Sequence, residues 1–238
     1  MPPAKKRPRR YDPAKTRAAV LAQLGHVRDA VRDLDSEPVR ALTATVAASL
    51  SEVGHAVARS TGAKPTLTPA EWFLAPGTRP SGSPAPLAEV EARLRDLLDT
   101  HPAGHPVDVG PGVMTLDDFL VTRLVDLVLC ADDLTTRGLD VPFDRQALAA
   151  ATRVLADTLA LKSPGASTEV RVPPYAVVQC VPGPRHTRGT PPNVVETAPL
   201  TWLRLATGRL TWPDALARAE VSASGERADL SGLLPLLP

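Results

Sequence analysis

Residues 183–197, GPRHTRGTPPNVVET, concentrate the side chains best suited to binding a ligand. Arg185, His186, Arg188 and Asn193 can all donate hydrogen bonds, and the prolines among them reduce the freedom of the loop. Arginine binds carboxylates and phosphates through parallel N–H donors, so the set suits an anion. The same arginines can instead cap backbone carbonyls or pair with nearby acids, because ion-pair networks are common. Residue types alone leave both interpretations open.

A second group lies in a long apolar helix expected over residues 115–137, where Arg123, Asp126 and Cys130 interrupt the apolar pattern. Asp126 and Cys130 are four residues apart and share a helix face. With a third ligand from another helix they can hold a metal, and carboxylate, thiolate and imidazole would suit zinc. The second expected helix places Thr45 opposite them, where a histidine would be needed. One carboxylate and one thiol in an apolar helix are more often a capped acid and a packed small residue.

Asp132 and Asp133 follow near the end of the same helix, where negative charge opposes the helix dipole. Asp133 is placed to pair with Arg137 one turn further on. It can instead lean toward the second half of the chain and meet an arginine of the 183–197 loop. That pair would be a contact between domains without a role in chemistry.

The elements that position these residues follow from the spacing of apolar side chains. Apolar residues recur at helical intervals in five segments, which predict a helical bundle. The segments are 12–37, 38–60, 87–100, 115–137 and 144–161. A proline-rich surface loop over 62–86 carries a predicted capping box, Thr68 to Glu71, ahead of Trp72 and Phe73. Residues 101–112 are predicted to be a linker.

The pattern changes after Ser163-Pro164-Gly165. Alternating or continuous β-type residues predict strands at 168–172, 176–181, 193–196 and 221–224, and helices are expected at 199–207 and 212–219. The predicted fold class is therefore α+β. The expected domains are a disordered basic tail over 1–11, the helical bundle over 12–162 and a small α+β domain over 167–238.

Composition excludes several classes of function. The 238 residues carry a net charge of +1, which provides no field to attract nucleic acid. No apolar run is long enough to span a membrane, so membrane insertion is not expected. The two cysteines lie in unlike contexts and no signal peptide precedes them, which favours reduced thiols in a cytoplasmic protein.

Four motifs in the last third give the chain a family resemblance. They are VRVPPYAVVQC (170–180), GPRHTRGTPPNVVET (183–197), TWLRLATGRLTW (201–212) and ASGERADLSGLLPLL (223–237). They resemble the actinobacterial sterol carrier family proteins, the bacterial sterol-carrier-protein orthologues. More widely, the chain resembles the mycothiol-dependent maleylpyruvate isomerase family, through VRALTATVAA (39–48) and DFLVTRLVDLVLCADDLTTRG (118–138). The resemblance implies a DinB-like helical bundle followed by a small sterol-carrier-like α/β domain.

The resemblance also implies where a metal would bind in enzymes of that family. A histidine of the second helix and a Glu-x-x-x-His pair of a later helix hold a divalent metal there, and these positions correspond to Thr45, Asp126 and Cys130. All three depart from the pattern, which argues against the enzyme chemistry. An arginine of the small domain faces the cleft in those enzymes. Arg185, Arg188 and Arg209 are the candidates for it in this chain.

A non-catalytic binding protein for a small anionic, amphipathic or lipid-like molecule is therefore the expected function, with no cofactor. Its expected ligand-binding residues are Arg185, His186, Arg188, Asn193 and Arg209. One alternative is a mycothiol-dependent, zinc-containing isomerase or S-transferase. Another is an interaction or regulatory protein that uses the same scaffold. The sequence indicates neither the ligand nor the oligomeric state.

Overall fold

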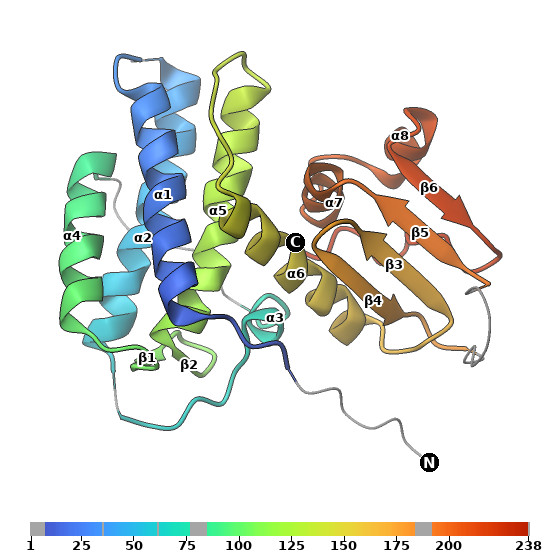
Figure 1. Cartoon of the computed structure of the whole chain (residues 1–238), viewed down its shortest axis with the longest axis horizontal. Coiled ribbons are helices and arrows are strands. Elements are labelled where there is room, and N and C mark those ends of the chain that lie inside the picture. Colours follow the sequence, from blue (N-terminus) through green and yellow to red (C-terminus); the bar gives the residue numbers. More distant parts are fainter. Residues whose placement is uncertain (1–7, 35, 61, 77–84, 184–191, 238) are drawn as a thin grey trace.

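A computed structural model describes residues 8–34, 36–60, 62–76, 85–183 and 192–237 of the chain. Helices of the first two thirds form a bundle, and the last third forms a four-stranded sheet with two further helices (Figure 1). The predicted α+β class, a helical bundle followed by a small α/β unit, is confirmed. None of the helices described is both long and apolar enough to cross a membrane.

The bundle helices begin close to the predicted positions, and all of them except α1 also end close to those positions. They are α1 (Pro13–Val31), α2 (Glu37–Ala58), α4 (Leu87–Thr100), α5 (Leu116–Thr135) and α6 (Arg145–Lys162). Asp12, Thr115 and Asp144 cap α1, α5 and α6 by accepting a hydrogen bond from a backbone N–H of the first turn. The short helix α3 (Pro69–Trp72) has the predicted capping box between Thr68 and Glu71.

α5 is the centre of the bundle, since it packs against α1, α2 and α6 and nearly all of its residues are buried. Its apolar side chains from Leu116 to Leu134 all lie in the core. A helix buried on all sides leaves little contact between its polar side chains and water. Such side chains must find partners on other elements.

Two predictions about the bundle were wrong. Residues 101–112 were expected to be a linker, but they carry β1 (Pro106–Asp108), which pairs antiparallel with β2 (Val113–Thr115). The hairpin is stabilised by burial of Val107 and Met114, and its strands are too short to produce a strand pattern in the sequence. The first helical segment was expected to extend to residue 37, but α1 ends at Val31 and Leu34 beyond it is exposed.

Residues 8–11, the last part of the predicted disordered tail, lie against α6. Arg9 forms an ion pair with Asp157 of α6, with Nε 2.7 Å from Oδ2. Tyr11 is largely buried and packs against the core, and burial raises the pKa of its hydroxyl. The ion pair joins positions 148 residues apart in sequence, which local composition does not indicate.

The sheet of the second unit has the order β4-β3-β5-β6. Its strands are β3 (Thr168–Val172), β4 (Ala176–Cys180), β5 (Val194–Thr197) and β6 (Val221–Ser224). β3 and β5 are parallel, and the other neighbours are antiparallel. The chain passes from β5 to β6 through α7 (Pro199–Ala206) and α8 (Trp212–Ala217).

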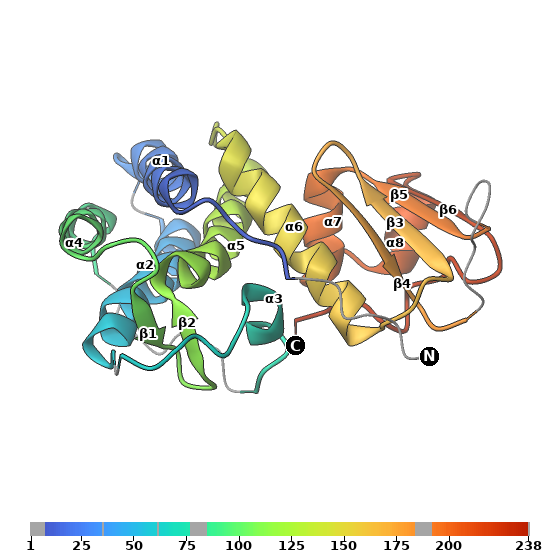
Figure 2. The same ribbon diagram turned by 60° about the horizontal axis from the view of Figure 1, so that its bottom comes forward.

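α6 belongs to both halves of the molecule. It packs against α5 on one side and against β4 and α7 on the other, and both views show it between the bundle and the sheet (Figures 1 and 2). Arg153 of α6 donates a hydrogen bond to the carbonyl of Tyr175 in the β3–β4 turn. Lys162, at its end, donates to the carbonyls of Leu233 and Pro235. The two halves therefore share one helix as well as an interface.

Two ion pairs join α5 to the second unit. Arg204 of α7 binds Asp132 through two hydrogen bonds, 2.7 and 2.6 Å long, and the Asp132 side chain is only 4% exposed. Asp133 pairs with Arg209, whose Nη2 lies 3.1 Å from Oδ2. The prediction had placed Asp133 with Arg137 or with a loop arginine. Arg137 instead donates to the backbone carbonyl of Asp133.

We expect Asp132→Ala to lower the free energy of unfolding by about 3 kcal/mol, because it leaves a guanidinium unpaired at a buried interface. Guanidinium chloride denaturation measures the change. Asp157→Ala is the matched control, since it removes an arginine partner of similar geometry at a more exposed site, where such pairs contribute below about 1 kcal/mol. Equal losses for the two variants would contradict a stabilising role for the Asp132 pair.

Candidate functional site

Four polar residues form a line along one side of α5, and we call this line the α5 seam: Arg123, Asp126, Cys130 and Asp133. Their spacings of three, four and three residues place them on one helix face. α2 faces the seam along most of its length, and Arg209 of the second unit reaches it at Asp133. The seam therefore runs from the interior of the bundle to the boundary between the two units.

At the boundary end, a carboxylate and a thiol lie close to Arg209. Cys130 is 3% exposed, and its Sγ lies 3.9 Å from the carbonyl oxygen of Leu42 on α2. Burial is the main cause that raises the pKa of the thiol to about 12; the charge of Asp133 acts in the same direction, and Arg209 opposes the shift. Cys130 is therefore a protonated thiol at neutral pH. A protonated thiol is a poor nucleophile.

In the middle of the seam, the Asp126 carboxylate accepts a short hydrogen bond from the hydroxyl of Ser49 on α2. Thr45, the third position of the hypothetical metal site, is exposed and donates its hydroxyl to the carbonyl of Ala41 one turn back. The described residues contain no group of three histidine, cysteine, aspartate or glutamate side chains that could hold a metal ion. Thr45, Asp126 and Cys130 thus do not fit the zinc of the enzyme alternative.

At the inner end, Arg123 is a buried cation with few hydrogen-bond partners among the described residues. Its side chain is 1% exposed, and burial lowers the pKa of its guanidinium. The guanidinium carbon lies 4.7 Å from the ring centroids of both Trp72 and Phe119. Its Nε donates to the Thr122 hydroxyl at 3.1 Å. Cation–π attraction stabilises such a charge but does not satisfy its N–H groups.

The loop predicted to bind an anion lies largely outside the described residues, including Arg185, His186 and Arg188. Asn193, which immediately precedes β5, is described and is 7% exposed. Its amide nitrogen donates to the carbonyl of Ser167 at 2.7 Å, and its Oδ1 accepts from the backbone N–H of Arg227 at 3.0 Å. These contacts join the starts of β3 and β5 to the segment after β6, and a role of Asn193 in ligand binding stays a prediction.

Gly225 explains why Asn193 is held so closely. Its backbone has φ of +99°, and a Cβ there would lie 2.2 Å from the Pro192 carbonyl oxygen and 2.4 Å from Oδ1 of Asn193. Only glycine fits this approach. The returning end of the loop is therefore fixed to the sheet at Pro192 and Asn193.

Of the predicted site residues, the structure brings together Asp126, Cys130 and, at the boundary, Arg209. Sequence reasoning missed Ser49 as the partner of Asp126 and Trp72 as the partner of Arg123. The available signal was the set Arg123, Asp126 and Cys130 on one face, because a polar line on a buried helix requires polar or aromatic partners. The identity of those partners depends on tertiary packing.

The α/β part of the chain matches a known family. Residues 144–236, which begin at the cap of α6 and end beside the C-terminus, match the family described as bacterial SCP ortholog. The predicted resemblance to this family is confirmed for these residues. No curated protein matches the chain.

Two solved structures match most of the chain, both of a mycothiol-dependent maleylpyruvate isomerase. One has a TM-score of 0.59, and the other, a point mutant of such an isomerase, has a TM-score of 0.56. Each is 15% identical in sequence and covers 92% of this chain and 95% of its own. At that identity the likeness establishes a shared fold, with the helical bundle and the α/β unit in the same order.

We expect both thiols of the native protein to react slowly with a disulfide reagent at pH 8. Burial raises the pKa of Cys130 to about 12 and of Cys180 to about 11, so few thiolates exist at that pH. Colorimetric thiol titration should detect them promptly only after unfolding. Fast native labelling that disappears in Cys130→Ser would contradict the assignment of Cys130 as an inert thiol.

The same shifts predict a pH dependence of stability. Both thiols titrate at higher pH in the folded chain than in the unfolded chain. Below about pH 8.5, the ordinary pKa of a thiol, both cysteines are protonated in the folded and the unfolded chain, and stability does not depend on them. Above that pH the thiols ionise only in the unfolded chain, so the free energy of unfolding falls until the pH passes the pKa values of the folded state.

Proposed function

We propose that the chain is a non-catalytic protein that binds a small anionic or amphipathic molecule where the bundle meets the α/β unit. The observation that carries this proposal is the state of the α5 seam. Its thiol is protonated, its central carboxylate is hydrogen-bonded to Ser49, and its threonine partner is bonded to its own helix. These groups are not arranged for nucleophilic or metal-assisted chemistry.

Arg209 is the described residue best placed to meet a ligand at the boundary. Its side chain is 37% exposed, and Asp133 is its ion-pair partner among the described residues. The hydrogen bonds to Asp133 use Nε and Nη2, which leaves Nη1 without a bond to the described residues and able to bind a further oxygen atom. The family match of residues 144–236 covers Arg209 as well as Arg185 and Arg188. We propose all three as anion-binding residues.

We expect a thermal-shift screen of small organic anions to find molecules that raise the melting temperature. Arg209→Gln should reduce their effect, because one charge-assisted hydrogen bond contributes roughly tenfold in affinity. Arg218→Gln is the matched control, since it removes the same charge from an exposed position of the same unit. If neither Arg209→Gln nor the double variant Arg185→Ala, Arg188→Ala alters any ligand response, the boundary site is wrong.

The similarity in fold to a mycothiol-dependent isomerase motivates a second candidate, a zinc-containing isomerase or S-transferase. In such an enzyme the metal would polarise a thiol or carbonyl. The degenerate positions Thr45, Asp126 and Cys130 disfavour it. We expect protein purified without a metal-binding tag to contain far less than one zinc per chain by mass spectrometry. If the wild type contains one zinc per chain and Asp126→Ala contains none, the non-catalytic binding proposal is wrong and the zinc enzyme is favoured.

A further inference from the structure

Arg123 is the one group of the α5 seam whose charge the described residues leave poorly compensated. A guanidinium carries five N–H donors. The described residues accept from its Nε at 3.1 Å, through the Thr122 hydroxyl, and from Nη1 at 3.4 Å, through the Ser49 carbonyl. The second of these bonds is long. A cation that is 1% exposed usually has a full set of partners, because removing it from water is costly.

The nearest carboxylate does not supply the missing partners. Oδ2 of Asp126 lies 3.8 Å from Nη1, beyond hydrogen-bond distance, because Ser49 holds that same oxygen. Glu52 is the other acid that acts on Arg123, and it binds Arg59 and His55. The two carboxylates therefore attract the positive charge of Arg123 without a hydrogen bond to it, and Nη2 of Arg123 makes no hydrogen bond to the described residues.

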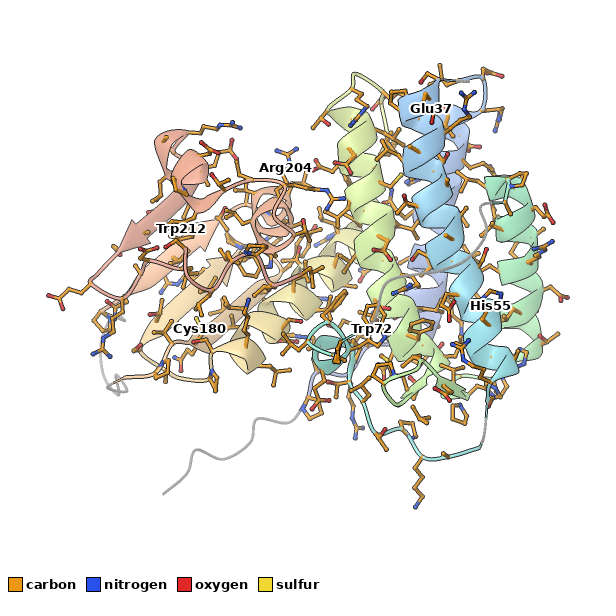
Figure 3. All side chains as sticks on the ribbon, turned by 180° about the vertical axis from the view of Figure 1, so that it is seen from behind. Glu37, His55, Trp72, Cys180, Arg204 and Trp212 are labelled. Atoms are coloured by element: carbon orange, nitrogen blue, oxygen red, sulfur yellow. The ribbon has the colours of Figure 1, made fainter. Side chains whose placement is uncertain are left out.

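A second donor in the same place also lacks a partner. Trp72 is 6% exposed, and its buried Nε1–H has no hydrogen-bond acceptor among the described residues. Its ring and that of Phe119 have centroids 6.0 Å apart and meet edge to face, so that the guanidinium occupies the corner between them. Trp72 is the last residue of α3, and Figure 3 shows it next to α5. A buried tryptophan N–H normally finds an acceptor.

We infer that the Arg123 guanidinium and the Trp72 Nε1–H bind the carboxylate group of a small molecule inside the bundle. A carboxylate offers acceptors to both donors, and guanidinium and carboxylate match in planar geometry. Asp126, whose side chain is 34% exposed, marks the side on which the seam reaches solvent. A singly charged carboxylate suits the site better than a doubly charged phosphate, because Asp126 already places one negative charge beside it.

Asp126 gives the site a built-in competitor. Its carboxylate is 3.8 Å from the same cation, so it repels an incoming anion and competes for Arg123. Removing its charge should therefore strengthen carboxylate binding. A purely structural Arg123–Asp126 pair predicts no such gain. The inference adds a site inside the bundle to the boundary site proposed above and names the chemical group that is bound.

The test uses the indole N–H signals of the full-length protein in two-dimensional NMR. Trp72→Phe assigns the signal of Trp72, and Trp202 is an internal control, because its buried Nε1–H also lacks a partner but no guanidinium lies over its ring among the described residues. Acetate and benzoate should shift the Trp72 signal saturably and leave Trp202 unmoved. Chloride at equal ionic strength should have no effect, and phosphate should act more weakly.

The variants then identify the cation. Arg123→Met should weaken the response at least tenfold, and Arg123→Lys should weaken it less, because it keeps the charge without the planar fork. Asp126→Asn should strengthen binding severalfold. The inference is overturned if carboxylates do not shift the Trp72 signal in either the wild type or Asp126→Asn. This result does not depend on whether Arg123→Met folds. Stronger binding of phosphate would overturn the ligand class.

The outcomes separate this inference from the proposed function. Ligands that depend on Arg209 but leave Trp72 unmoved would preserve the boundary site and reject the one at Arg123. If carboxylates shift the Trp72 signal but no ligand depends on Arg209, the site at Arg123 is preserved and the boundary site is rejected. Absence of every anion response would reject both.

Discussion

The burial of α5 is the constraint on which the rest of the structure depends. A helix surrounded by α1, α2 and α6 buries several of its charged side chains, so each buried charge determines what must lie opposite. Asp117 is held by Arg17 and by the backbone N–H of Gly104, and Asp132 is held by Arg204. The position of the segment before β1 and the seating of α7 therefore follow from charges on one helix. Arg123 is the residue for which this matching is incomplete among the described residues.

The helices and strands could be predicted closely from the sequence because their signals are local. Caps at Asp12, Thr115 and Asp144, and the box from Thr68 to Glu71, produce the boundaries that they indicate. The hairpin at 106–115 could not be predicted, because three-residue strands carry no periodicity. The contact of Arg9 with Asp157 depends on tertiary packing and leaves no local signal either.

The site was predictable only in its residue types. Asp126 and Cys130 lie on one face as their spacing requires, and a partner for Asp133 in the second unit was foreseen as a possibility. Its identity, Arg209, was not, because the path of the chain between α7 and α8 determines which arginine arrives there. The internal contacts of Asn193 were not predictable either. Gly225 approaches it closely and its amide nitrogen donates to the carbonyl of Ser167, and both contacts depend on how the strands pack.

Because α6 packs on the sheet as well as on the bundle, the compositional break in the sequence is not the boundary of the packed α/β unit. The compositional break lies at Ser163-Pro164-Gly165, yet the family match starts at Asp144, one helix earlier. Without α6 the β4 side of the sheet and α7 would lose the surface on which they pack. The stretch that matches the family is thus the sheet together with the helix on which it packs.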